Sequence, residues 1–368
     1  MLYFNGEANL NTKKILLGCH LSPPVHGAGV IGDMVVDVVK NENVKIVKIP
    51  GEENLSHIGR LTLKKIFYNL IFIVKFNFFS LISNEIYYTP SPYGFALKRD
   101  FLSLILAKLL NKKVTLHLHS RGFSSTISNP INKFFVDFIF SRSNVIFLSE
   151  WHKSDLPKEN FNSINRSFVV NNSISSFHKY EDKKKEKNEY NFLFLSNLIE
   201  SKGVFTAIDF CEEFARENKN IRVNLRLVGA YPSESVKENI KNYINKETKC
   251  SNVFLIGPKY GDDKVSEFKY CHYLLFPTKY DKEVFPLVVL EAMSFGIPPI
   301  VSNHASLPEM VSEEFGYVLD FNKESCRLLQ DKLIKDDYFK LSRVAFNEYK
   351  NKYTEDIFYH NIYQVLIK

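Results

Sequence analysis

Two glutamates, Glu283 and Glu291, stand eight positions apart around the start of a short apolar segment. Pro286 suits the first position of a helix there, because the N–H that proline lacks would have no partner at that position. Gly296 suits the position just after the helix, where φ is often positive. The N–H groups that follow Pro286 would face outward at the positive end of the helix dipole, where a phosphate binds. The segment therefore predicts an anion site flanked by two carboxylates, with an ordinary helix bearing two solvated glutamates as the alternative.

A glycine-rich loop follows the first apolar run, and Gly27, Gly29 and Gly32 have the spacing of a dinucleotide-binding turn. That interpretation fits poorly, because two prolines separate the loop from its strand and no acidic residue closes the next strand. Glycine has no side chain, so its backbone can approach a ligand closely. Gly27 and Gly29 are therefore candidate ligand contacts, and a plain helix entry is the alternative.

Two histidines and a lysine are further candidates for chemistry. His117 and His119 alternate along an apolar run, so a strand places both on one face. His119 stands at the carboxyl end of that strand, where ligands of open parallel sheets bind. Lys202 follows another apolar run and could neutralise the charge that develops on a leaving group. We favour His119 over His117, with a structural histidine and a solvated lysine as the alternatives.

Short apolar runs alternate with helical patterns along the 368 residues, a length that suggests two domains. The alternation predicts an α/β protein whose parallel sheets are covered by helices on both faces. The predicted strands cover residues 14–18, 44–49, 86–89, 114–119, 145–149, 168–170, 192–196, 223–228, 253–256, 273–276, 300–302 and 317–319. The predicted helices cover residues 27–40, 61–82, 95–110, 131–141, 204–217, 233–245, 265–271 and 287–295, with two helical stretches at the end. The highly charged segment 179–188 has no apolar period and is the best candidate linker.

The run from Glu283 to Pro298 reads E-x-F-P-L-x-x-x-E-A-M-x-x-G-x-P, and Pro308-Glu309 follows it. This run resembles the signature of the retaining family-4 glycosyltransferases, which have the GT-B fold. The resemblance implies two doubly wound, Rossmann-like domains that face each other across a cleft. Residues 1–178 would form the acceptor-side domain, residues 190–354 the donor domain, and a last helix, about 355–368, would cross back onto the first domain.

The resemblance also implies a reaction and assigns roles to the candidate residues. A sugar would pass from a UDP- or GDP-linked nucleoside diphosphate to an acceptor hydroxyl, as in hexosyltransferases. Catalytic roles would fall to His119, Glu283 and Lys202, and Glu291 would hydrogen-bond the ribose. The implied contacts to the nucleotide sugar are Gly27, Gly29, Asn197, Lys202, Phe285, Pro286, Leu287, Val288 and Glu291.

One position departs from the family pattern, because Ser196-Asn197 stands where Gly-Arg is typical. Losing the arginine removes bidentate recognition of a phosphate, and Asn197 offers only a neutral hydrogen-bond donor. We therefore expect Lys202 to bear more of the diphosphate charge. The sequence has no Asp-x-Asp motif, so we expect no divalent metal and no cofactor other than the nucleotide-sugar substrate.

The apolar stretch 61–82 is interrupted by lysines and asparagines, so it predicts an amphipathic helix that does not span a membrane. This helix either packs on its own domain or touches lipid, with Phe76, Phe78 and Phe79 nearest to lipid. Residues 1–190 carry a net charge of +9 and the remainder −2, which favours an anionic membrane surface as a partner of the first half. A solvated basic surface is the alternative.

Five scattered cysteines and the absence of an amino-terminal signal pattern indicate a cytoplasmic protein, peripheral on the inner face of the membrane. The sequence has no basic-aromatic recognition motif, so we expect no nucleic-acid partner. A composition rich in lysine, asparagine and phenylalanine favours a bacterial enzyme of surface-polysaccharide biosynthesis (capsule or lipopolysaccharide), with a lipid-linked or growing surface glycan as acceptor. The alternatives are a catalytically silent nucleotide-sugar sensor or scaffold, and a nucleotide-sugar epimerase on the same scaffold.

Overall fold

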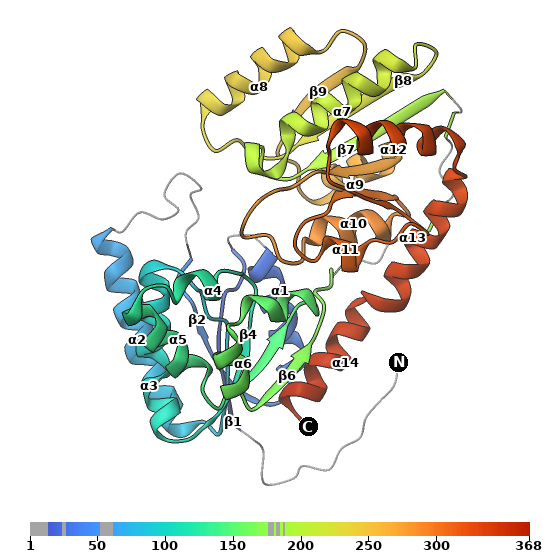
Figure 1. The fold of residues 1–368 in the computed structure, drawn as a ribbon. Coiled ribbons are helices and arrows are strands. Elements are labelled where there is room, and N and C mark those ends of the chain that lie inside the picture. Colours follow the sequence, from blue (N-terminus) through green and yellow to red (C-terminus); the bar gives the residue numbers. More distant parts are fainter. Residues whose placement is uncertain (1–13, 24–26, 52–61, 176–179, 182–184, 187) are drawn as a thin grey trace.

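The computed structural model describes residues 14–368 apart from 24–26, 52–61, 176–179, 182–184 and 187. The chain forms two α/β domains that lie one above the other in Figure 1. The amino-terminal segment, part of the glycine-rich loop, part of the expected linker and Leu61 lie outside the described residues. The fold class expected from the sequence is confirmed, because each domain is a parallel sheet between helices.

The first domain contains a six-stranded parallel sheet in the order β2-β1-β3-β4-β5-β6. This order reverses between β1 and β3, as in flavodoxin-like folds, and not as in the Rossmann order. Its strands are β1 (Lys14–Cys19), β2 (Asn43–Lys48), β3 (Glu85–Tyr88), β4 (Lys113–His117), β5 (Asn144–Phe147) and β6 (Arg166–Val169). Its helices are α1 (Gly27–Val39), α2 (Leu63–Ile82), α3 (Gly94–Leu109), α4 (Phe123–Thr126), α5 (Pro130–Phe140), η2 (Trp151–Asp155) and α6 (Lys158–Ser163).

The second domain contains another six-stranded parallel sheet, in the order β12-β11-β10-β7-β8-β9. This is the Rossmann order, and it reverses between β7 and β10. Its strands are β7 (Glu189–Leu195), β8 (Arg222–Val228), β9 (Asn252–Gly257), β10 (Tyr273–Phe276), β11 (Pro299–Ser302) and β12 (Tyr317–Leu319). Its helices are η3 (Glu200–Lys202), α7 (Val204–Glu217), α8 (Glu234–Glu247), α9 (Gly261–Tyr270), α10 (Leu287–Ser294), α11 (Leu307–Met310), α12 (Lys323–Lys335) and α13 (Tyr338–Lys352).

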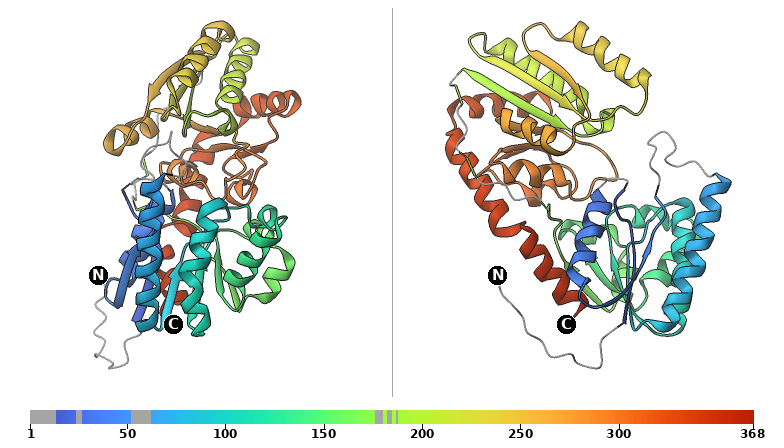
Figure 2. Two further views of the ribbon diagram at one scale, coloured as in Figure 1. Left: turned by 90° about the vertical axis from the view of Figure 1, so that its left-hand side faces the viewer. Right: turned by 180° about the vertical axis from the view of Figure 1, so that it is seen from behind.

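The chain ends with three helices, so the prediction of two helical stretches was wrong. The last of them, α14 (Glu355–Leu366), leaves the second domain and lies beside α1 of the first, as the rear view in Figure 2 shows. Its buried side chains complete the apolar core on that face of the first sheet; they are Phe358, Ile362, Val365 and Leu366. The first domain is therefore built from both ends of the described chain.

Hydrogen bonds at three places join the described parts of the two domains. The Glu309 carboxylate accepts from the backbone N–H groups of Glu150 and Trp151, at 3.0 and 2.6 Å. The buried Asn172 amide donates to the Phe285 carbonyl at 3.1 Å. The Ser173 hydroxyl donates to the Tyr353 carbonyl at 2.7 Å, just before α14 begins. The loop that leads into α10 is thus held directly by the first domain.

Helix α2 packs one face on the first domain and leaves an apolar face open. It contacts α3, and Phe72 and Phe76 enter the core beneath the sheet. The expectation that Phe76 faces lipid is wrong, because Phe76 is fully buried, whereas Phe78 is 58% exposed. Among the described residues, α2 is the one helix long and apolar enough to cross a membrane. Its buried face shows that it is also an integral part of the domain.

The two phenylalanines provide a matched test of this packing. Phe76→Ala should destabilise the protein by about 3–5 kcal/mol, because it removes a fully buried ring and leaves a cavity. Phe78→Ala should change the unfolding free energy by less than about 0.5 kcal/mol, since its ring faces outward. Urea unfolding of both variants measures the difference. Equal losses from the two substitutions would contradict the assigned orientation of α2.

Candidate active site

A pocket of about 520 Å³ lies between the two domains at the carboxyl ends of their strands. On the second domain it lies where the strand order reverses, between the ends of β7 and β10. Ligands of doubly wound sheets bind at such a reversal, because the loops on its two sides diverge and leave a crevice. The first domain closes the pocket with Gly27, Ala28 and His119. The fold therefore gathers at one place candidate residues that are far apart in sequence.

Lys202 reaches the pocket from the loop after β7. It ends the short helix η3, and Gly203 follows with a left-handed φ of 88°. A Cβ at position 203 would lie 2.2 Å from the Pro277 carbonyl oxygen, so only glycine allows this close approach of the loops after β7 and β10. The approach aims the Lys202 ammonium at the loop that carries Glu283, with which it forms an ion pair.

Glu283 is a buried carboxylate at the end of that loop, with 8% of its surface exposed. Its ion pair with Lys202 balances the cost of burying its charge. The Lys202 ammonium also lies over the Tyr280 ring, 4.5 Å from its centroid, so an aromatic face adds to its stabilisation. The two residues expected to act on the sugar and the diphosphate are thus in direct contact with each other.

Helix α10 begins at the pocket between the two glutamates. Pro286 precedes the helix as its N-cap, with ψ of 122°, so the expectation that it occupies the first helical position is wrong by one residue. Gly296 follows the helix with φ of 63°, in the left-handed region expected for it. The N–H groups of Leu287 and Val288 are the first two of the helix and have no partner within it, and both residues line the pocket. An anion could be held there.

Glu291 lies on the pocket side of α10 and is paired with Lys264 of α9, whose Nζ donates to Glu291 Oε1 at 2.6 Å. Burial raises the pKa of Glu291, and the Lys264 charge opposes that rise. Lys264 is not predicted from the sequence, because pairing between α9 and α10 is a tertiary contact that no local pattern reports.

His119 lines the pocket from the first domain, and His117 lies behind it. The two rings are in contact, with centroids 4.1 Å apart and planes tilted by 43°, and His117 Nδ1 is 2.7 Å from the Tyr87 hydroxyl. Burial lowers the pKa of His117 well below its usual value, and the neighbouring His119 and His152 lower it further. His117 is therefore neutral at physiological pH, and it supports the His119 ring without adding charge behind it.

The remaining expected residues divide between the pocket wall and its surroundings. Asn197, Phe285 and Pro286 line the pocket together with Gly27. Gly29 is buried in α1 and is not among the lining residues. Further lining residues that the sequence analysis did not identify are Ala28, Val30, Asn172, Lys259, Tyr260 and Lys282.

The pocket has the chemistry of a site for a phosphorylated, hydroxyl-rich ligand. Lys202, Lys264 and the first turn of α10 supply positive potential. Glu283 and Glu291 supply carboxylates that can accept hydrogen bonds from hydroxyl groups. In the described part of the chain, no group of three or more histidine, cysteine or acidic side chains has an arrangement that could hold a metal ion.

The second domain matches the model of a known protein family. The family model of the glycosyl transferases group 1 matches residues 176–353, which include Lys202, Glu283 and Glu291. No curated protein is significantly similar to the chain in sequence.

Several solved structures share the fold of almost the whole chain. HepE of Anabaena, in complex with UDP and glucose, is 13% identical, with 96% of this chain and 99% of its own covered and a TM-score of 0.66. Sucrose-phosphate synthase of Thermosynechococcus elongatus is 12% identical, with 96% and 98% covered and a TM-score of 0.68. The pneumococcal O-GlcNAc transferase GtfA, in complex with UDP and GlcNAc, is 14% identical, with 81% and 60% covered and a TM-score of 0.56.

The Lys264–Glu291 pair predicts a pH-dependent loss of stability when the lysine is removed. In Lys264→Met the Glu291 carboxylate loses its cation, so its pKa should rise further above the value in the unfolded chain. A carboxyl group with a raised pKa in the folded protein destabilises the fold as the pH rises past the unfolded pKa. We therefore expect a loss of about 1–3 kcal/mol at pH 7 and a smaller loss at pH 5, measured by urea unfolding.

Glu291→Gln in the Lys264→Met background is the control. It should recover part of the lost stability at pH 7 and remove the difference between the two pH values, because the side chain no longer ionises. A loss in Lys264→Met that is the same at pH 5 and pH 7 would contradict the pairing.

Proposed function

Since this chain is a nucleotide-sugar-dependent glycosyltransferase of group 1 with the GT-B fold, we propose that it transfers a hexose from a UDP-linked sugar to an acceptor hydroxyl. The observation that carries the proposal is a single interdomain pocket containing Lys202, Glu283, Glu291 and the start of α10. UDP is preferred to GDP because the similar structures of HepE and GtfA hold UDP. The configuration at the sugar carbon is retained.

The diphosphate binds where positive potential is concentrated. Lys202 and the first turn of α10 hold its charge as the bond between the sugar C1 and the phosphate oxygen breaks. Lys202 is paired with Glu283, so a bound diphosphate competes with Glu283 for the lysine. Glu283 then accepts hydrogen bonds from sugar hydroxyls, and Glu291 accepts one from the ribose.

The acceptor attacks C1 from the face that the diphosphate leaves, so the configuration is kept. The acceptor oxygen forms the new bond to C1, and its proton passes to the departing phosphate oxygen. His119 lies at the first-domain wall of the pocket, where it can hydrogen-bond the sugar and orient the acceptor. These steps need the charges of the protein and the substrate alone, so activity should persist in EDTA.

The acceptor is a lipid-linked or growing surface glycan, and the enzyme works on the inner face of the cytoplasmic membrane. The support for this is the open face of α2, where Phe67, Leu70, Val74 and Phe78 are 51–69% exposed on one helical stripe. An apolar stripe on a basic domain is typical of helices that lie in a membrane interface. Lys64, which is exposed on the same helix, supplies charge for anionic headgroups.

Lys202 and Asn197 test how the diphosphate is held. Lys202→Ala should lower kcat by about 10²-fold or more, since it removes a charge that stabilises the leaving group. Asn197→Ala should have a smaller effect, because Asn197 is exposed and offers a neutral donor. The kcat of both variants is measured from the release of UDP from UDP-glucose and from UDP-N-acetylglucosamine.

The outcomes separate the competing functions. A larger loss of kcat in Asn197→Ala than in Lys202→Ala would show that Lys202 is not the main group that holds the diphosphate charge. Binding of UDP sugars, detected by thermal shift, without any UDP release would favour a silent sensor. Conversion to an epimeric UDP sugar would favour an epimerase.

Membrane association depends on the exposed aromatic side chains of α2. Phe67→Ser/Phe78→Ser should weaken cosedimentation with vesicles that contain anionic lipid by about tenfold or more, because it removes two rings from the apolar interface. Phe339→Ser, an exposed phenylalanine of the second domain at 43%, is the matched control and should have no effect. If the double variant binds the vesicles as strongly as wild type does, the role of α2 is purely structural.

A further inference from the structure

The pocket between the domains contains a lysine whose surroundings differ from those of the other lysines. Four lysines line the pocket, namely Lys202, Lys259, Lys264 and Lys282. Three of them are paired with carboxylates, as Lys202–Glu283, Lys259–Asp263 and Lys264–Glu291. Lys282 forms no ion pair with another described residue, and its ammonium lies instead over the Tyr93 ring, 4.7 Å from the centroid. Its charge is therefore available to a ligand in the pocket.

Tyr93 of the first domain holds Lys282 from across the pocket. The Tyr93 hydroxyl donates to the Arg121 carbonyl at 2.7 Å. Gly122 has φ of 125° and allows this bond, because a Cβ at that position would clash with the hydroxyl. The ring is thus fixed to the loop that follows β4, and its face attracts the ammonium. An aromatic ring holds Lys282 without neutralising its charge, as a carboxylate would.

A second cation, Arg121, lies close to the same ring. Its guanidinium lies over the Trp151 ring, 4.9 Å from the centroid, and donates no hydrogen bond to a described residue. Burial and Asp155 raise the pKa of Tyr93, and the charge of Arg121 opposes that rise, so the guanidinium is near the Tyr93 hydroxyl. Tyr93 therefore has a cation from each domain near it.

Two carboxylates, those of Asp155 and Asp281, also lie near Tyr93. The buried Asp155 is already occupied, because its oxygens accept three hydrogen bonds at the start of α4, from Gly122, Phe123 and Ser124. Asp281 is exposed, so water screens its charge. Neither carboxylate forms an ion pair with Lys282 or Arg121, and both cations keep donors for a ligand.

Both cations adjoin the part of the pocket where the sugar is expected. Lys282 directly precedes Glu283, which the proposed function assigns to sugar hydroxyls. Arg121 follows His119 of the first-domain wall by two residues. Arg121 and Trp151 follow β4 and β5, which are neighbours in the first sheet, so both lie at the carboxyl edge that faces the pocket. A sugar bound between His119 and Glu283 therefore lies beside both cations.

We propose that Lys282 and Arg121 form a subsite for a carboxylate or phosphate group on one of the two sugars that meet in the pocket. The planar guanidinium of Arg121 matches such a group with two parallel N–H donors, and Lys282 adds a point charge. The group belongs to the donor sugar, as in a UDP-linked uronic acid, or to the acceptor sugar. The proposal rests on the proposed function, because it takes sugar transfer in this pocket as given. It adds a choice of substrate by charge, at a place separate from the diphosphate.

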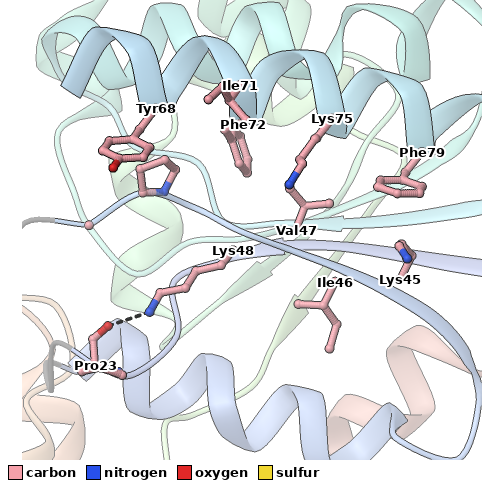
Figure 3. Close-up of a pocket in the computed structure, with 12 residues that line it drawn as sticks. Pro23, Lys45, Ile46, Val47, Lys48, Tyr68, Ile71, Phe72, Lys75 and Phe79 are labelled. Atoms are coloured by element: carbon pink, nitrogen blue, oxygen red, sulfur yellow. Dashed lines mark hydrogen bonds between the residues drawn. The ribbon is translucent and has the colours of Figure 1, made fainter. Parts of the chain in front are cut away.

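Two lysines of another cavity serve as a charge-matched control. This cavity, of about 670 Å³, lies on the first domain between α2 and β2, and Lys45 and Lys75 line it (Figure 3). Figure 3 shows Lys45 beside Phe79, at the opposite end of the cavity from Pro23. Of the residues that line the cavity, Pro23 is nearest in sequence to the glycine-rich loop of the interdomain pocket. Lys45→Gln/Lys75→Gln therefore removes two positive charges from the protein away from that pocket.

The donor arm of the test measures the binding of UDP-glucuronate and UDP-glucose to the full chain by calorimetry. These two donors differ only in the carboxylate that replaces the hydroxymethyl group. If the donor carries the charged group, wild type should bind UDP-glucuronate about tenfold or more tightly than UDP-glucose, the scale of a hydrogen bond to a charged group. Arg121→Gln/Lys282→Gln should bind the two alike, whereas Lys45→Gln/Lys75→Gln should keep the wild-type preference. Both double variants should still bind UDP, which shows that the pocket is folded.

The acceptor arm measures the release of UDP from UDP-glucose when glucose 6-phosphate or glucuronate is added, each compared with glucose. If the acceptor carries the charged group, a charged sugar should raise the rate of UDP release by wild type about tenfold or more above that with glucose. Arg121→Gln/Lys282→Gln should lose this difference. Glucose 6-phosphate and glucuronate distinguish a subsite for phosphate from one for carboxylate.

A single variant keeps the test valid if the half-buried Arg121 is needed for folding. Lys282 is exposed, so Lys282→Gln should fold like wild type. It should lose part of the preference for the charged sugar in whichever arm wild type shows one.

Two results would overturn the proposal. One is a wild-type protein that responds alike to charged and neutral sugars in both arms. The other is a preference for charged sugars that Lys282→Gln and Arg121→Gln/Lys282→Gln retain, or that Lys45→Gln/Lys75→Gln loses equally. Binding that prefers the charged sugar, without UDP release from any donor, would instead sink the proposed function and leave the subsite supported.

Discussion

The ion pair between Lys202 and Glu283 organises the active site, because it joins the loops on the two sides of the point where the second sheet reverses. A carboxylate as buried as Glu283 is stable only beside a cation. Gly203 permits the close approach of the two loops, and Asn172 fixes the carbonyl of Phe285 from the other domain. The pair therefore holds the two loops, and the charges that they carry, in place. A diphosphate can take over the lysine, so binding of the substrate exchanges one counter-charge for another.

The sequence alone predicted the parts of this site that a continuous motif encodes. The E-x7-E run located both glutamates and the start of α10. The alternation of strands and helices located all twelve strands, with bounds within two residues except for β7, which begins three residues earlier than predicted. The sequence could not predict the partner of Glu291, because Lys264 reaches that carboxylate only after α9 and α10 pack together. It also misplaced Phe76, since the apolar residues of α2 surround much of the helix, and only the neighbouring sheet decides which of them are buried. Local patterns report the period of a helix more reliably than its orientation.

The first domain has two surfaces near a common edge. The exposed stripe of α2 begins near the carboxyl edge of the first sheet, and the first-domain wall of the pocket lies at the same edge. This follows from the parallel sheet, in which every strand ends at the same edge and every following helix begins there. A parallel sheet thus allows an exposed apolar surface and a wall of the pocket to lie within one domain without a dedicated connecting element.

The packing of α14 on the first domain affects the order in which this protein can fold during synthesis. The side chains of Phe358, Ile362 and Val365 belong to the core beside Leu17 and Val35, which the ribosome makes more than 300 residues earlier. Domains usually fold as they emerge, amino-terminal first. Here the first domain lacks part of its core until the second domain has been made. The apolar face of α1 that packs against α14 therefore stays uncovered through most of translation. The second domain, which contains its own core, is positioned to fold before the first is complete.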